Sequence, residues 1–164
     1  MIKTVDLLSV LKFLILTSSS PVASQVIGTI SRKFNVNLHP VDFNRKFFDS
    51  RPLLGKGKTI EGSIGGIAAP VILSLFLAID CCLAFLLGIG AVLGDIFESF
   101  VKRRLGKERG EDWYPWDSID FYVGAVIISQ LWNYIKITEI IVIGIILIVV
   151  HPIMTKIAKI LKVK

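Results

Sequence analysis

Residues 88–104 read GIGAVLGDIFESFVKRR, an apolar run that ends in charged residues. In an α-helix, which turns about 100° per residue, one stripe of this segment carries four polar side chains: Asp95, Glu98, Ser99 and Lys102. A carboxylate at membrane depth is costly unless it faces protein, water or a metal ion. The segment therefore predicts a membrane helix with a polar stripe at one end.

The whole chain has the composition of a membrane protein. Of its 164 residues, 53% are hydrophobic and 20% are charged, and the mean hydropathy is +0.69. These values rule out a disordered chain, and two cysteines are too few for a disulfide scaffold. Because a spanning helix needs about 20 apolar residues, we expect an all-α polytopic bundle of about five transmembrane helices. They are predicted at 6–30, 60–79, 82–101, 120–135 and 139–160.

The first of these segments has two interpretations. Its Ser18–Pro21 break and the small residues 22–24 resemble the end of a cleaved signal peptide. Asp6 and Lys12 interrupt the basic-then-apolar layout of a signal peptide and favour retention of the segment. Cleavage stays open at this point.

The basic residues predict the orientation. Sixteen of the 19 lysines and arginines fall in three segments that five spans would put on one side: 31–58, 102–119 and the C-terminal end. The positive-inside rule places these segments in the cytoplasm and the N-terminus outside. The formal net charge of +6 then reflects orientation and gives no reason to expect a nucleic-acid partner.

Small residues predict where helices approach closely. Gly62 and Gly66 lie four residues apart in the second span, and Gly90 and Gly94 repeat the spacing in the third. Such spacing lets a neighbouring backbone come near. We expect these two helices to cross tightly, and the same faces suit a homodimer.

The acidic residues predict a metal site, against a simpler alternative. In the simpler alternative, Asp95 and Glu98 only form ion pairs with Lys102 and Arg103, as helix spacing allows. The next loop adds more acids than these ion pairs require: Glu108, Glu111, Asp112, Asp117 and Asp120. Asp117 and Asp120 are one turn apart and can share a face. Carboxylates among lysines and arginines suit a divalent cation that handles phosphate, and all-oxygen ligands favour Mg²⁺.

A second polar segment precedes the second span. Its Gly57-Lys58-Thr59 suggests a P-loop, but that motif requires a glycine where this chain has Pro52. Lys58 and Thr59 still suit an anion at a helix N-terminus, with Thr59 as the cap. Glu61 fits either the helix dipole or a metal ion. Upstream, the aromatic and basic residues of 42–49 fit an interfacial segment or a lid over a lipid-phosphate site.

Together these motifs resemble the archaeal CDP-archaeol synthases, five-span relatives of the CDP-diacylglycerol synthases. The resemblance rests on VDFNRKFFD at 41–49, LLGKGKT at 53–59, GDIFESFVKRRLG at 94–106, Arg109-Gly110 and PWDSIDF at 115–121. The family commonly has Asp-Gln-Leu-Asp-Phe where this chain has residues 117–121, and often an acid where this chain has Lys56. We claim no metal role for Lys56.

The resemblance implies an enzyme of membrane phospholipid biosynthesis. It would transfer CMP from CTP to an isoprenoid glycerol ether lipid phosphate, 2,3-bis-(O-geranylgeranyl)-sn-glycerol 1-phosphate, and release pyrophosphate. Residues 1–164 would then form a single transmembrane catalytic domain that faces the cytoplasm through loops 31–58 and 102–119.

The expected site residues follow from the resemblance and from the chemistry of phosphate transfer. Mg²⁺ would be held by Asp95, Glu98, Asp117 and Asp120. The nucleotide phosphates would be held by Lys58, Thr59, Ser99, Lys102, Arg103 and Arg104. The residues expected to be catalytic are Asp95, Asp120 and Lys102.

Two other functions fit parts of the sequence. A small cation channel or transporter subunit would explain Asp95, Glu98 and Glu61 as the lining of an ion path. It leaves unexplained why the charges cluster at one end of the predicted bundle. A non-catalytic scaffold would use the glycine faces and basic loops for partners.

Overall fold

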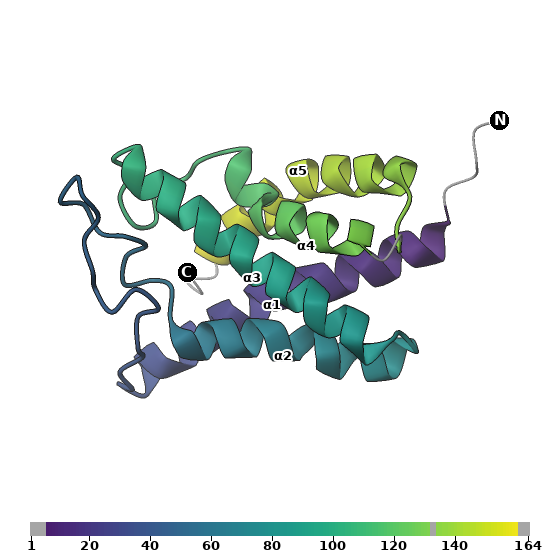
Figure 1. Cartoon of the computed structure of the whole chain (residues 1–164), viewed down its shortest axis with the longest axis horizontal. Coiled ribbons are helices and arrows are strands. Elements are labelled where there is room, and N and C mark those ends of the chain that lie inside the picture. The colour runs from purple at the N-terminus through teal and green to yellow at the C-terminus, as the bar shows by residue number, and fades with distance from the viewer. Residues whose placement is uncertain (1–5, 132–133, 161–164) are drawn as a thin grey trace.

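The computed structural model describes residues 6–131 and 134–160, and it describes residues 151 and 154–160 by their backbone alone. It contains five α-helices and one short 3₁₀ helix (Figure 1): α1 (Leu7–Lys33), α2 (Ile60–Leu77), α3 (Cys81–Arg104), η1 (Trp116–Ser118), α4 (Asp120–Leu131) and α5 (Ile137–Ile160). The described residues form no β-strand beyond two isolated bridges. The predicted all-α architecture is confirmed, and the five α-helices overlap the five predicted segments.

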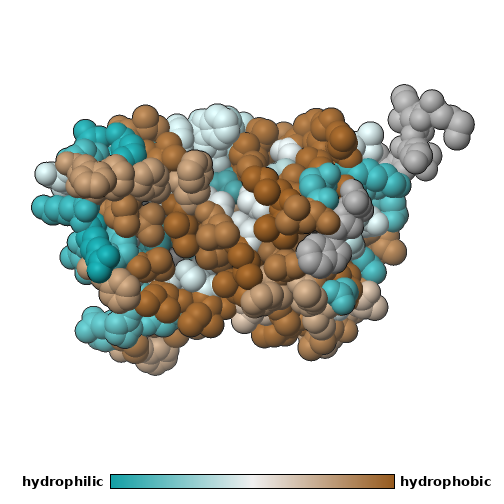
Figure 2. Space-filling model, in the orientation of Figure 1, coloured by the Kyte–Doolittle hydropathy of each residue, from teal (hydrophilic) through white to brown (hydrophobic). Residues whose placement is uncertain are grey.

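The helices have the surface of a membrane protein. Three of them, α1, α2 and α3, are long and apolar enough to cross a membrane, and α4 and α5 carry shorter apolar stretches. Large hydrophobic side chains such as Ile72, Phe76 and Ile127 point outward. Figure 2 shows apolar residues over the middle of one face and hydrophilic residues toward its ends. This distribution fits a bundle surrounded by lipid.

The sequence marks where the helices begin. Asp6, Thr59 and Asp80 cap α1, α2 and α3, and each side chain accepts a hydrogen bond from a backbone amide in the first turn. These residue types are preferred caps because they satisfy amides that lack a helical partner. The predicted cap at Thr59 is confirmed.

A common core joins four of the helices. Phe13 and Leu16 of α1, Leu87 of α3, Tyr122 of α4 and Ile143 of α5 are all buried in it. Tyr122 also donates a hydrogen bond of 2.5 Å from its hydroxyl to the carbonyl of Ile140. The first helix is therefore an integral part of the packed bundle.

The predicted close packing of α2 against α3 is confirmed, but it is made through Gly88, whose Cβ would lie 3.0 Å from the Ile67 backbone, and not between the two predicted glycine faces. Gly90 and Gly94 lie against α4. A Cβ added at Gly94 would come within 2.2 Å of the carbonyl oxygen of Asp120. Gly62 and Gly66 lie against α1, where the Ser24 hydroxyl donates a 2.7 Å hydrogen bond to the Gly62 carbonyl. The four-residue spacing predicts a close approach but carries no information on which helix approaches.

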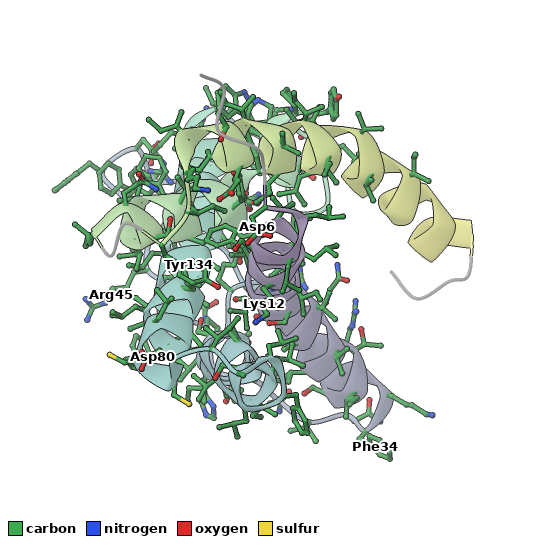
Figure 3. The ribbon with its side chains drawn as sticks, turned by 90° about the vertical axis from the view of Figure 1, so that its right-hand side faces the viewer. Asp6, Lys12, Phe34, Arg45, Asp80 and Tyr134 are labelled. Carbon is green, nitrogen blue, oxygen red and sulfur yellow. The ribbon has the colours of Figure 1, made fainter. Side chains whose placement is uncertain are left out.

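The two long connections meet at one end of the bundle. Residues 34–59 and 105–119 both lie at the left in Figure 1, beside the C-terminal end of α3. The opposite end holds a cavity of about 550 Å³. Asp6, Lys12, Asp80 and Tyr134 line that cavity and face the viewer in Figure 3. Most of the predicted site residues belong to the first end.

Candidate functional site

The candidate site lies at the C-terminal half of α3. This helix presents Asp95, Glu98 and Lys102 at one end of the bundle, and α2, η1 and α4 contribute the residues opposite them. The close contact of Gly94 with the backbone of Asp120 brings the first residue of α4 next to Asp95. The two helices can approach this closely because Gly94 has no side chain, and the approach places Asp95 beside Asp120.

One charged pair joins the segment before α2 to α3. The ammonium group of Lys58 lies 2.5 Å from Asp95 Oδ1, and both side chains are partly buried. Asp120 is within electrostatic reach of both residues. A cavity of about 190 Å³ opens beside this pair and is also lined by Ser24, Thr59 and Gly62. Lys58, Asp95 and Asp120 therefore form the first half of the site.

A second group surrounds Lys102. Its ammonium group lies 2.9 Å from Glu98 Oε1 and also forms an ion pair with Asp117. The side chains of Lys102 and Glu98 are only 12% and 8% exposed. Glu98 Oε1 accepts no hydrogen bond of good geometry from any described residue. Glu98, Lys102 and Asp117 therefore form the second half of the site, a buried cluster of two acidic side chains around one ammonium group.

Asp117 is held as a carboxylate by its surroundings. Burial favours a higher pKa, but the hydrogen bonds that the Glu98 carboxyl group and the Lys102 ammonium group donate to Asp117 outweigh it. The backbone amide of Trp113 adds a third, with a length of 2.6 Å. The pKa of Asp117 consequently lies below its usual range, so this residue stays charged at neutral pH.

The four predicted metal ligands are divided between the two halves. Within the described part of the chain, no three acidic, histidine or cysteine side chains are grouped as a metal-binding set. Asp95 and Asp120 lie on the Lys58 side and Glu98 and Asp117 on the Lys102 side, while Asp120 is also within electrostatic reach of Glu98. All four side chains offer oxygen ligands, which suit a hard cation such as Mg²⁺. The lysine ammonium groups that now pair with them would have to move away for the cation to bind.

The remaining predicted phosphate ligands differ in their availability. Thr59 uses its hydroxyl to cap α2, and Ser99 is buried one residue after Glu98. Arg103 donates to the Lys107 carbonyl at 2.6 Å, while its Nε atom has no hydrogen-bond partner among the described residues. Arg104 is occupied by Asp49 and by the Pro52 carbonyl. The Nε atom of Arg104 also has no hydrogen-bond partner among the described residues, so the two arginines differ in that only Arg104 pairs with a carboxylate.

The other acids of the sequence lie in separate contacts. Glu61 accepts hydrogen bonds from the His39 amide and lies 2.6 Å from the His39 ring nitrogen. Glu111 pairs with Lys107 at 2.8 Å. The ion-pair alternative is confirmed for Lys102 and Glu98, although Asp117 from outside α3 joins that pair. It is wrong for Asp95, which pairs with Lys58 and not with a basic residue of α3.

Asp42 organises the connection between α1 and α2, a role that was not predicted from the sequence. Asp42 is only 5% exposed, and its carboxylate accepts hydrogen bonds from the amides of Asn44, Leu54 and Gly55. Burial favours a higher pKa, but these amides hold the pKa of Asp42 below its usual range. The Asp-Phe-Asn sequence, which favours a turn closed by the aspartate side chain, was the available signal.

The fold and this site together define an intramembrane enzyme: helices long enough to span a bilayer surround buried carboxylates and lysines at one end. Residues 5–164 match the CarS-like family model, which describes CDP-archaeol synthases. The chain belongs to this family.

Several relatives resemble the chain over most of its length. The CDP-archaeol synthase of Thermofilum pendens is 38% identical over 86% of this chain and 69% of that protein. The corresponding synthase of Pyrobaculum islandicum is 34% identical over 88% of this chain and 90% of that protein. A solved structure of an intramembrane enzyme for archaeal membrane lipids biosynthesis matches with a TM-score of 0.72, 29% identity and 91% coverage of both chains.

Proposed function

We propose that this protein is a CTP-dependent cytidylyltransferase that converts an isoprenoid glycerol ether lipid phosphate to its CDP-lipid. The observation that carries the proposal is the pairing of Lys58 with Asp95 and of Lys102 with Glu98 and Asp117 at one end of a membrane bundle. The family membership supports the same reaction and substrate class. A cation channel is not favoured, because these charges gather at one end of the helices instead of following a path across them.

The reaction suits this set of residues. A phosphate oxygen of the lipid attacks the α-phosphorus of CTP, the bond from that phosphorus to the bridging oxygen breaks, and pyrophosphate leaves. The lipid oxygen is already ionised at neutral pH, so the main barrier is to bring two anions together and to stabilise the leaving group. Lys58, Lys102 and Arg103 would hold the triphosphate, and Ser99 would donate a hydrogen bond to a phosphate oxygen.

We assign a metal role to the four carboxylates. Asp95, Asp117 and Asp120, with Glu98 beside them, would hold one or two Mg²⁺ ions. Bound Mg²⁺ would supply positive charge to the phosphate oxygens. The lysines that now pair with these acids would then turn to the phosphates of CTP.

The site is proposed to open to the cytoplasm for CTP and sideways to the bilayer for the lipid. The concentration of basic residues in 31–58 and 102–119 supports the first direction. The position of the acids at helix ends, next to lipid-facing apolar side chains, supports the second. The homodimer stays a prediction.

Purified protein tests the activity directly. CTP and Mg²⁺ are mixed with the protein and with either an archaeal ether lipid phosphate or an ester-linked phosphatidic acid. We expect CTP-dependent pyrophosphate release with the ether lipid. No release with either lipid would reject the synthase, and equal rates with both would reject an ether-specific substrate.

Asp120→Asn tests the proposed ligand set. This substitution keeps the shape of the side chain but removes its charge, so turnover should fall more than tenfold while the unfolding temperature in detergent stays near that of the wild type. The matched control is Asp80→Asn at the other end of α3, where asparagine caps a helix about as well as aspartate. More than about a tenth of the activity in Asp120→Asn, equivalent to about 1.4 kcal/mol of barrier, would remove Asp120 from the essential residues.

A further inference from the structure

A small hairpin forms part of the connection between α1 and α2. Residues 45–53 turn back on themselves through hydrogen bonds of 2.9 Å from Phe47 N to Arg51 O and from Leu53 N to Arg45 O. Lys46 and Pro52 form an isolated antiparallel bridge within it. Two short paired segments have little stability of their own in water. Hairpin 45–53 therefore depends on whatever it packs against.

Arg104 holds this hairpin against the end of α3. Its guanidinium donates to Asp49 Oδ1 at 2.6 Å and also to the Pro52 carbonyl. The same guanidinium stacks over two rings, 4.8 Å from the centre of Phe47 and 5.1 Å from that of Phe100. These contacts use the planar fork and the flat face of arginine together, which a lysine cannot do.

A second contact joins hairpin 45–53 to the C-terminal end of α3. Arg51 donates from Nη1 to the Arg104 carbonyl at 2.7 Å, where α3 ends and its carbonyls lack helical partners. Arg51 and Arg104 thus join hairpin 45–53 to α3 in both directions. The arrangement is a clamp that consists of Arg51, Arg104 and Asp49.

The clamp is linked to the candidate site through Asp42. Its carboxylate binds the amides of Leu54 and Gly55, directly after the hairpin. The Gly55 carbonyl in turn accepts a hydrogen bond from the Lys58 amide, and Lys58 reaches Asp95. The hairpin and the segment that carries Lys58 are therefore joined through Asp42, and the adjacent Val41 amide also donates to the Lys58 carbonyl at 2.9 Å.

We propose that Arg104 is a positioning residue for Lys58 and not itself a ligand of the nucleotide phosphates. By fixing hairpin 45–53 to α3, Arg104 sets the place from which Lys58 meets CTP. The effect on CTP rests on the proposed function, whereas the clamp itself rests on the contacts above. Arg104 would thus have a structural role in place of the phosphate-binding role that the sequence suggested.

Two single substitutions distinguish these roles. Arg104→Lys keeps the positive charge but loses the planar fork and flat face that hold the hairpin, so the clamp would open. Asp49→Ala removes the partner of Arg104, which opens the clamp without removing any cation. The matched control is Arg45→Lys, in the same hairpin, because the Arg45 side chain is exposed and has no ion pair with any described residue.

Hydrogen exchange of the peptide covering 45–53, in the protein without substrate, measures the clamp. Steady-state kinetics measure its effect on the reaction. We expect Arg104→Lys and Asp49→Ala each to speed exchange and to raise KM for CTP about tenfold, with a smaller change in kcat. The double variant should be little worse than Arg104→Lys alone, because Arg104→Lys already disrupts the contact with Asp49 that Asp49→Ala removes. Arg45→Lys should match the wild type.

Three results would overturn the proposal. A raised KM in Arg104→Lys with normal exchange and a normal Asp49→Ala would make Arg104 a direct phosphate ligand. Faster exchange in both variants with unchanged KM and kcat would make the clamp irrelevant to CTP. Unchanged exchange in both variants would mean that there is no clamp. Because exchange requires no substrate, a wild-type protein without turnover would reject the proposed function separately.

Discussion

Replacing Gly94 with alanine should separate α3 from α4 at the candidate site. The added Cβ would lie 2.2 Å from the Asp120 carbonyl oxygen and 3.2 Å from the Gly124 nitrogen, while ordinary contact begins at 3.4 Å. These are backbone atoms that cannot rotate away. The two helices would have to move apart by about 1 Å, which overpacking studies associate with a cost of about 1–3 kcal/mol.

The catalytic effect should exceed the effect on stability. Asp120 begins α4 and Asp95 follows Gly94, so a separation of the helices changes the distance between these two acids. A misplacement of about 1 Å can cost about 100-fold in rate. We therefore expect pyrophosphate release by Gly94→Ala to fall by about 100-fold, with a fall of only a few degrees in the unfolding temperature in detergent.

The matched control is Gly28→Ala in α1. A Cβ at Gly28 meets nothing within 4 Å, so this variant should keep its activity and stability. The measurements are initial rates at saturating CTP and lipid, together with thermal unfolding. If Gly94→Ala keeps more than about a third of the wild-type rate, the contact does not set the geometry of the site.

Three further predictions concern charge. Lys102→Met should lower the free energy of unfolding by about 3 kcal/mol or more, because it leaves Glu98 and Asp117 buried without a cation. Adding Glu98→Gln should recover part of that loss in thermal unfolding. The pKa of Asp42 lies below its ordinary value of 3.8, so its stabilisation of residues 42–55 is full above that value and is lost as the pH falls through the lower, folded-state pKa. Hydrogen exchange corrected for intrinsic rates should show this loss in the wild type and not in Asp42→Asn. Chelation by EDTA should stop pyrophosphate release and added Mg²⁺ should restore it, and full activity in EDTA would reject the metal role of the carboxylates.

The sequence predicted the helices well because each follows from local residues. Apolar runs of sufficient length end at charged or capping residues, and Thr59 caps α2 as expected. The stripe of α3 also followed from helix geometry alone. Glu98 and Lys102 are four residues apart and pair as that spacing predicts.

The contacts between distant segments were harder to predict. The spacing of Gly90 and Gly94 does not identify α4 as the partner, because any helix with a small residue can approach such a face. Arg104 looked like a phosphate ligand because its sequence neighbours are Lys102 and Arg103. Only the folded structure of residues 34–59 shows that Asp49 forms an ion pair with Arg104.

The Asp42 contacts have a consequence for the entropy of binding. Residues 34–59 contain no helix and no strand, and a connection of this length would ordinarily lose much conformational entropy when a ligand orders it. One buried carboxylate already ties its two halves together, so it behaves as two shorter loops. A nucleotide bound at Lys58 as proposed would therefore meet a segment whose shape is set beforehand, and more of the contact energy would remain as affinity.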